Sequence, residues 1–481
     1  CASAASLFSS VLVQEGGCPF VFILGDLEEA GYFYHDLTQI LGTERVLFFP
    51  SSFRRSIKYG QKDAANEILR TEVLSRLQKG EEGLCIVTYP DALAEKVVSR
   101  KELSNKTLKL NVGEKVDTTF ITDVLHSYGF EYVDYVYEPG QYAVRGSIID
   151  VFSFASEYPY RIDFFGDEVE SVRTFEVESQ LSREKKDGVS IVPDLAVTGD
   201  VTTSFLDFIP KETTLAMRDF LWLRERIQVV HDEALTPQAI AVQEAEENGG
   251  ITLEGKLIDG SEFTVRALDF RRLEFGNKPT GTPNASVTFN TSAQPIFHKN
   301  FDLVASSFKD YLEKGYSLYI CSDSMKQTDR IKAIFEDRGD KINFTPVERT
   351  IHEGFVDNTL RLCIFTDHQL FDRFHKYNLK SDKARSGKVA LSLKELNQFT
   401  PGDYVVHTDH GIGRFSGLVR IPNGDTTQEV LKLVFQNEDV VFVSIHSLHK
   451  VSKYKGKEGE APRLNKLGTG AWEKLKERTK S

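Results

Sequence analysis

The stretch FVFILGDLEEAGYFYHDLTQILG, Phe20–Gly42, begins with an apolar run and continues, after a glycine, as an amphipathic segment. This order predicts a buried strand, a loop and a helix, as at the start of a nucleotide-binding domain. A P-loop here needs glycines, a lysine for the outer phosphates and a serine or threonine for magnesium. The loop Gly25–Tyr32 has no lysine, and Asp26, Glu28 and Glu29 stand where a phosphate would bind. Carboxylates favour a helix N-terminus but repel a triphosphate, so the stretch predicts a structural α/β domain without ATPase activity.

The pattern continues on both sides of this stretch. Two more apolar runs, RVLFFP and GLCIVTYP, predict buried parallel strands, and KDAANEILRTEVLSRLQKG predicts an intervening helix that ends at Gly80. Strands that alternate with helices predict a doubly wound sheet.

The composition limits the class of protein. A chain of 481 residues suggests about three to five domains. Its net charge of -12 argues against non-specific coating of nucleic acid, which needs clustered lysine and arginine. The five cysteines are scattered and never reach C-x-x-C spacing, as is typical of a protein in a reducing cytosol. No apolar run approaches the ~20 residues that span a bilayer, and the first residues lack a basic region. We therefore expect a cytoplasmic protein with no membrane partner.

The most specific stretch is YAVRGSIIDVFSFASEYPYRIDFFGDEVESVRTF, Tyr142–Phe175. Its segments Arg145–Phe152 and Tyr160–Arg173 closely resemble the UvrA-binding module shared by UvrB and the transcription-repair coupling factors (Mfd). The preceding stretch ITDVLHSYGFEYVDYV is similar to the same module. The resemblance implies that UvrA is a partner.

A later stretch separates these two families. PGDYVVHTDHGIGRFSGL, followed by EVLKLVF and VVFVSIHSLHKVSKY, resembles the CarD-related domain by which coupling factors bind RNA polymerase. UvrB has no such domain. The tail KLGTGAWEKLKER resembles the helix that leads into the translocase motor of the coupling factors, and we expect the motor itself to be absent from this chain.

The resemblance implies a multidomain α/β and α+β chain, in which a UvrA-binding module is inserted into a degenerate P-loop-like α/β scaffold. A small α/β domain and a small SH3- or Tudor-like β-barrel follow. The expected segments are a UvrB-like domain at 1–106, the UvrA-binding module at 107–195, the rest of the scaffold at 196–300, the small α/β domain at 301–390, the polymerase-interacting barrel at 391–465 and the start of a linker helix at 466–481.

The strand YRIDFF carries the candidate UvrA site. Alternation places Arg161, Asp163 and Phe165 on one face and apolar side chains on the other. A large aromatic among arginines fits a protein interface. Alternatively, Phe165 folds under the hairpin and the arginines pair with Asp163 or Asp167. The resemblance implies the interface, with Arg145, Arg161, Phe165, Asp163 and Arg173 as the UvrA-binding residues.

The candidate polymerase site lies in the barrel. EVLKLVF is apolar on both faces, which suits a small closed barrel. The short run GLVRIPNGD has the features of an exposed strand edge, which can add to a partner's sheet. The resemblance implies pairing with a strand of the polymerase β subunit, through Leu418, Val419, Arg420 and Ile421.

Two histidine pairs, His407 with His410 and His446 with His449, have a spacing that invites a metal interpretation. Both adjoin strands, where positions i and i+3 point to opposite faces, so we expect no metal site. No serine–histidine–aspartate or cysteine–histidine order suggests a catalytic site.

Together these features predict the non-catalytic part of a coupling factor, an adaptor between stalled polymerase and UvrA. ATP and magnesium are expected only in the motor, which would drive the full-length DNA translocase and make most of the DNA contacts. The alternatives are a CarD-like transcription regulator without a repair role, a UvrB-type excision protein, and a self-contained nuclease or ATPase, for which no motif is found.

Overall fold

The computed structural model describes residues 3–17, 19–52, 64–177, 179–195, 200–236, 239, 253–276, 279–373, 375, 377, 400–423, 426–444, 451–454, 462 and 464–466. Within these residues, no helix is both long and apolar enough to cross a membrane. The chain forms two compact units. The first comprises residues 1–106 and 195–379, and the second comprises residues 107–194 and 380–481.

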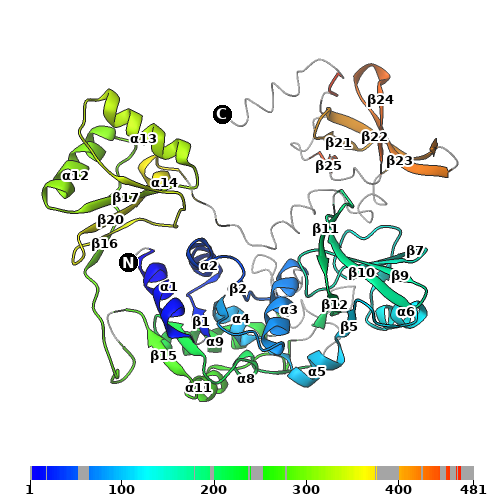
Figure 1. Ribbon diagram of the computed structural model, residues 1–481, viewed down its shortest axis with the longest axis horizontal. Helices are drawn as coiled ribbons and strands as arrows, with labels where there is room; N and C mark the ends of the chain where they lie inside the picture. The colour runs from blue at the N-terminus through cyan, green and yellow to red at the C-terminus, as the bar shows by residue number, and fades with distance from the viewer. Residues whose placement is uncertain are drawn as a thin grey trace. The chain divides into compact units, whose positions relative to one another are not determined.

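The first unit contains a five-stranded parallel sheet (Figure 1). In spatial order its strands are β15 (Arg271–Glu274), β14 (Thr214–Met217), β1 (Phe20–Ile23), β3 (Cys85–Thr88) and β2 (Val46–Phe48). Every residue of β1, β2 and β3 is buried, as the three apolar runs predicted. The prediction of buried parallel strands is therefore confirmed.

Helices and a short strand pair complete this part of the first unit. The helices are α1 (Ala4–Gly16), α2 (Leu27–Leu41), α3 (Ala64–Gln78), α4 (Pro90–Ala94), α5 (Arg100–Asn105), α8 (Phe205–Phe208), α9 (Phe220–Ala234) and α11 (Gly260–Ala267). The strands β4 (Val97–Val98) and β13 (Val201–Thr203) pair antiparallel. Helix α3 is followed by Gly80 with φ 71°, the left-handed conformation that glycine adopts most readily after a helix.

A second, mixed sheet belongs to the same unit. Its strands, in spatial order, are β16 (Thr291–Ala293), β19 (Phe355–Asp357), β20 (Leu362–Thr366), β17 (Ser317–Cys321) and β18 (Thr345–Val347). The helices of this domain are α12 (Phe301–Glu313), α13 (Met325–Asp337) and α14 (Asp367–Leu370). Its core contains many aromatic side chains, among them Phe297, Phe308, Phe335 and Phe365.

Histidines join helix α2 to this second α/β domain. The rings of Tyr32 and His352 stack with centroids 3.4 Å apart, and those of His368 and His375 stack at 4.4 Å. His35 of α2 meets His375 edge-on at 5.0 Å. Among the described residues, the contact thus contains the imidazole of His35 from α2 and those of His352, His368 and His375 from the other domain.

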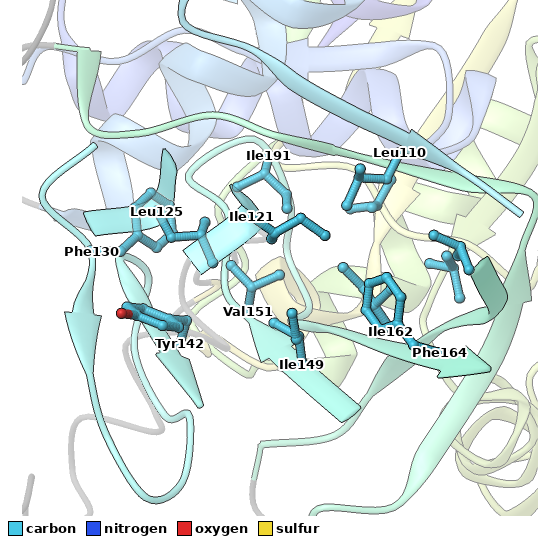
Figure 2. Packing of buried hydrophobic residues seen from close by; sticks show 13 residues of the cluster. Leu110, Ile121, Leu125, Phe130, Tyr142, Ile149, Val151, Ile162, Phe164 and Ile191 are labelled. Atoms are coloured by element: carbon cyan, nitrogen blue, oxygen red, sulfur yellow. The ribbon is translucent and has the colours of Figure 1, made fainter. Parts of the chain in front are cut away.

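In the second unit, residues 107–194 form a six-stranded sheet. In spatial order the strands are β11 (Ser182–Lys186), β10 (Glu168–Phe175), β9 (Tyr160–Phe165), β8 (Ile148–Val151), β7 (Gln141–Arg145) and β6 (Glu131–Tyr132). One face packs on α6 (Thr118–Ser127) and on the antiparallel pair β5 (Leu108–Asn111) and β12 (Gly188–Ile191). Figure 2 shows the side chains of this core, including Ile149, Val151, Ile162 and Phe164 of the sheet and Ile121 and Leu125 of α6.

The carboxyl-terminal part of the chain forms a five-stranded antiparallel sheet. Its strands, in spatial order, are β24 (Val440–Ser444), β23 (Thr426–Val434), β22 (Gly411–Asn423), β21 (Tyr404–His407) and β25 (Val451–Lys453). Leu431 and Leu433 are buried on one face of β23, and Val430 and Val434 are buried on the other, as the two-sided pattern predicted. In the described residues β24 and β25 are the edges, so closure into a barrel stays a prediction.

Candidate protein interfaces

The N-terminus of α2 is filled by the chain's own carboxylates. Asp26 Oδ1 accepts the backbone N–H of Glu29 at 2.9 Å, as an N-cap does. The Glu29 carboxylate in turn accepts the backbone N–H of Gly25 at 2.7 Å and pairs with Arg218 of the neighbouring β14–α9 loop. A backbone donor that a P-loop would offer to phosphate is therefore used by a side chain of the protein.

A cavity of about 50 Å³ is lined by residues of α3 and β4, among them Arg70, Leu74 and Val97. Its buried charges belong to the fold: Arg70 pairs with Glu95 at 3.3 Å and donates to the carbonyl of Pro50 at 2.8 Å. A space of this size has room for a few water molecules. These contacts indicate a structural ion pair and provide no argument for a substrate.

Strand register gathers the candidate UvrA residues on one face of the six-stranded sheet. Arg161 of β9 lies directly opposite Asp150 of β8 and Arg173 of β10. Directly opposite residues of neighbouring strands point to the same face. The opposite face of the sheet is the hydrophobic core. This polar face therefore brings together side chains that are far apart in the sequence.

A buried carboxylate lies at the centre of the face. Arg161 donates from Nε and Nη2 to the two oxygens of Asp150, at 2.8 and 2.9 Å, in a bidentate ion pair. Arg145 of β7 also donates to the Asp150 carboxylate. Asp150 is fully buried, whereas the side chain of Arg145 retains 35% of its exposure and that of Arg161 only 14%. The carboxylate thus neutralises one of two positive charges.

Aromatic rings and a carbonyl further hold these two arginines. The Arg161 guanidinium lies over the Phe175 ring, 4.5 Å from its centroid, and donates from Nη1 to the carbonyl of Gln180 at 3.1 Å. Arg145 lies over the ring of Tyr135 at 5.1 Å. Stacking of this kind adds attraction and fixes the plane of the guanidinium.

A second, looser pair lies farther along the face. Arg173 approaches Asp163 at 3.5 Å, and Ser147 donates to Asp163 at 3.2 Å. The Nε of Arg173 is buried and has no hydrogen-bond partner among the described residues. This arginine retains a buried, unused donor beside a carboxylate whose side chain is 25% exposed.

Phe165 lies at the end of β9 and points into solvent. Its side chain is 79% exposed, and the hairpin turns at the next residue, Gly166, with φ 62°. The alternative in which Phe165 folds under the hairpin is therefore wrong. The alternative pairing of the arginines with Asp163 or Asp167 holds for Arg173, which pairs with Asp163, whereas Arg145 and Arg161 pair with Asp150 instead.

The sequence interpretation missed Asp150. A signal was available: the tight turn after Arg145 pairs it with Ile148, and alternation from Ile148 places Asp150 on the polar face. A carboxylate between Ile149 and Val151 in a strand therefore needed a cationic partner.

The candidate polymerase strand is one half of a long hairpin. Leu418, Val419, Arg420 and Ile421 all pair with β23, whereas β21 pairs with β22 only over residues 411–414. Among the described residues, the other edge of this stretch faces no strand. Leu418 is 36% exposed. The backbone of Arg420 and Ile421 is described, but their side chains are not.

A bulge precedes this stretch. The register of β22 against β23 shifts between Phe415 and Leu418, where Gly417 has φ 111°. A bulge adds a residue to one strand and bends it. The bulge therefore bends β22 just before the candidate polymerase stretch.

The arrangement of His407 and His410 differs from the one expected from the sequence. The rings of His407 and His410 stack with centroids 4.5 Å apart instead of pointing to opposite faces. Strand β21 ends at His407, and a turn, not a strand, sets the direction of His410. In the part of the chain that the structure describes, no group of three potential ligands is placed to hold a metal ion. His446 and His449 lie outside the described residues.

Comparison with known proteins finds a family match over each of the two modules that carry the candidate interfaces. A model of the UvrB interaction domain matches residues 108–196, and a model of the CarD-like/TRCF RID domain matches residues 399–455. The chain is 23% identical to transcription-repair-coupling factors of Staphylococcus aureus (strain bovine RF122 / ET3-1) and Bacillus subtilis (strain 168), over 95% and 100% of its own length. It spans 45% and 46% of those proteins. The resemblance to the amino-terminal region of the coupling factors is thereby confirmed.

Proposed function

We propose that this chain is the non-catalytic adaptor part of a transcription-repair coupling factor that works in the cytoplasm. One end recruits UvrA, and the other binds the β subunit of a stalled RNA polymerase. The observation that carries the proposal is the exposure of Phe165 on the polar face of the six-stranded sheet. This sheet lies within the residues that match the UvrB interaction domain.

The polar face of the six-stranded sheet has the chemistry of a protein interface. Exposed aromatic and arginine side chains contribute a large share of binding energy at such surfaces. Phe165 provides the apolar anchor, and the half-exposed Arg145 and Arg173 provide donors at its side. The complementary surface on UvrA would combine acidic and apolar side chains.

The hairpin of β22 and β23 carries the polymerase end. Residues 418–421 pair on one side only among the described residues, so their backbone can extend a sheet of the partner. The match to the CarD-like/TRCF RID domain supports this assignment. Hydrogen bonds between backbones would supply affinity, and side chains such as Leu418 would supply specificity.

Catalysis belongs, in this proposal, to the motor of the full-length protein. ATP and magnesium would bind there and drive translocation on DNA. The filled N-terminus of α2 supports this division, because Glu29 and Asp26 use the donors at the place of a P-loop. In the full-length protein a carboxyl-terminal domain would mask the UvrA face, as the resemblance implies.

The test is binding of the purified chain to UvrA and, separately, to RNA polymerase, without ATP. Arg161→Ala combined with Phe165→Ala should abolish UvrA binding and leave polymerase binding intact. Phe120→Ala is the matched control, since Phe120 is an exposed aromatic of α6 in the same domain. Persistent UvrA binding by the double variant would overturn the assignment. Binding to polymerase alone by the unmodified chain would indicate a CarD-like regulator.

A further inference from the structure

We propose that Asp150 is a positioning residue of the UvrA face, which acts through Arg145 without touching UvrA. This inference rests on the proposed function. The carboxylate is fully buried beneath two guanidinium groups, so no partner can reach it. Its role is to hold the exposed arginine in one orientation before the partner arrives.

Most of the hydrogen-bonding capacity of Arg161 is used inside the protein. It donates twice to Asp150 and once to the carbonyl of Gln180, and one face of its guanidinium covers Phe175. An arginine with three donors occupied and a side chain only 14% exposed has little left for a partner. Arg161 therefore stabilises the UvrA face through contacts inside the protein.

Arg145 is the member of this group that a partner can reach. It shares the Oδ2 atom of Asp150 with Arg161, and Tyr135 stacks on its guanidinium. Two guanidinium groups around one carboxylate leave one positive charge, at the more exposed arginine. The group that fits beside it is a carboxylate of the partner, because guanidinium binds carboxylates with two parallel hydrogen bonds.

Fixing Arg145 in advance lowers the cost of binding. A free arginine side chain loses conformational entropy when a partner immobilises it. Without the Asp150 charge, two positive groups would face each other across a poorly solvated space, and Arg145 would turn toward solvent. The orientation needed by the partner's carboxylate would then be one of many.

The test compares Asp150→Asn with Asp163→Asn in the complete chain. Asp163 is the control because it lies on the same face and pairs with a different arginine. We expect Asp150→Asn to weaken UvrA binding about tenfold or more, as loss of a hydrogen bond to a charged group does. Polymerase binding should not change, and Asp163→Asn should weaken UvrA binding less.

A double-mutant cycle separates positioning from general damage. In an Arg145→Ala background, Asp150→Asn should have little further effect on UvrA affinity, because Asp150 acts through Arg145. If the losses of UvrA affinity caused by Arg145→Ala and Asp150→Asn multiply in the double variant, Asp150 does not act through Arg145 and the proposal is wrong. Normal UvrA binding by Asp150→Asn, with loss of binding by the Arg161/Phe165 double variant, would overturn the positioning role alone. UvrA binding by that double variant would instead overturn the proposed function.

A measurement on the unmodified chain covers the case in which Asp150→Asn does not fold. NMR of the arginine side chains, with Arg145→Lys to assign the signal, should show slow rotation of the Arg145 guanidinium. An Arg145 signal averaged by free rotation would contradict the proposal. Far-UV circular dichroism of each variant shows whether it is folded.

Discussion

The buried carboxylate of Asp36 in helix α2 accepts the backbone N–H of His352 at 2.7 Å, and so joins the first α/β sheet region to the second α/β domain. Its other oxygen accepts the hydroxyl of Ser6 in α1 at 3.0 Å. The histidine cluster lies beside this bond, and burial lowers the pKa of its imidazoles. This contact is therefore sensitive to protonation.

The docking of the second α/β domain on α2 should weaken as the pH falls below about 6.5. Burial, with neighbouring imidazoles, lowers the pKa of His35, His352 and His368 to about 4. A histidine whose pKa is lowered in the fold contributes stability that is fully present above the ordinary pKa of histidine. This stability is lost as the pH falls from that value toward the lowered pKa. Burial raises the pKa of Asp36 to about 6, which acts in the opposite direction over the same range, but three histidines outweigh one carboxylate.

Hydrogen exchange of the segment around His352 between pH 7 and 5 tests this prediction. Protection should fall with pH in the unmodified chain and fall less in His35→Gln, which cannot take up a proton. Asp36→Asn removes the opposing carboxylate and should steepen the loss. Because the charged residues Glu353, Asp367, Asp323 and Arg373 also surround the cluster, the comparison among variants is the decisive result. Protection that is independent of pH would refute the prediction.

Glu29→Ala should destabilise the first unit by about 1 kcal/mol, as loss of a capping interaction does. The variant loses the hydrogen bond to Gly25 and the pair with Arg218. It should still not bind ATP, because the loop lacks the lysine of a P-loop. Urea unfolding and binding of a fluorescent ATP analogue check the two parts, with the exposed Glu28→Ala as control. ATP binding by the variant would mean that Glu29 alone closes a working nucleotide site.

Phe165→Ala and Ile162→Ala should separate binding from stability. Ile162 is fully buried in the core of the six-stranded sheet, so its truncation should cost about 2–5 kcal/mol. Phe165 is exposed, and its truncation should change the free energy of unfolding by less than about 0.5 kcal/mol. Denaturation curves and UvrA affinity, measured on the same samples, check both. A large stability loss in Phe165→Ala would place its ring in a packing role.

Leu418→Lys should abolish polymerase binding and leave UvrA binding unchanged. It adds a charge to the part of β22 that pairs only with β23 in the described residues, and lysine on an edge strand opposes sheet extension. Phe442→Lys is the matched control, since Phe442 is an exposed apolar residue of the opposite edge strand, β24. Loss of polymerase binding in the control, with retention in Leu418→Lys, would move the interface to β24.

The sequence alone determined those features that depend on neighbours along the chain. Apolar runs predicted the buried strands β1, β2 and β3, and alternation predicted that Ile162 and Phe164 face the core. The missing lysine excluded a P-loop. Short motifs identified the two modules, because their residues are consecutive.

Only the tertiary structure decided which distant residues meet. Asp150 lies between Arg145 and Arg161 because the register of three strands aligns them, and register is a property of pairing between strands. The histidine cluster joins helix α2 to segments more than three hundred residues away. Burial of a charge and its partner is a non-local event, because only the packed fold removes water from a group such as Asp150 and supplies the guanidinium that replaces it.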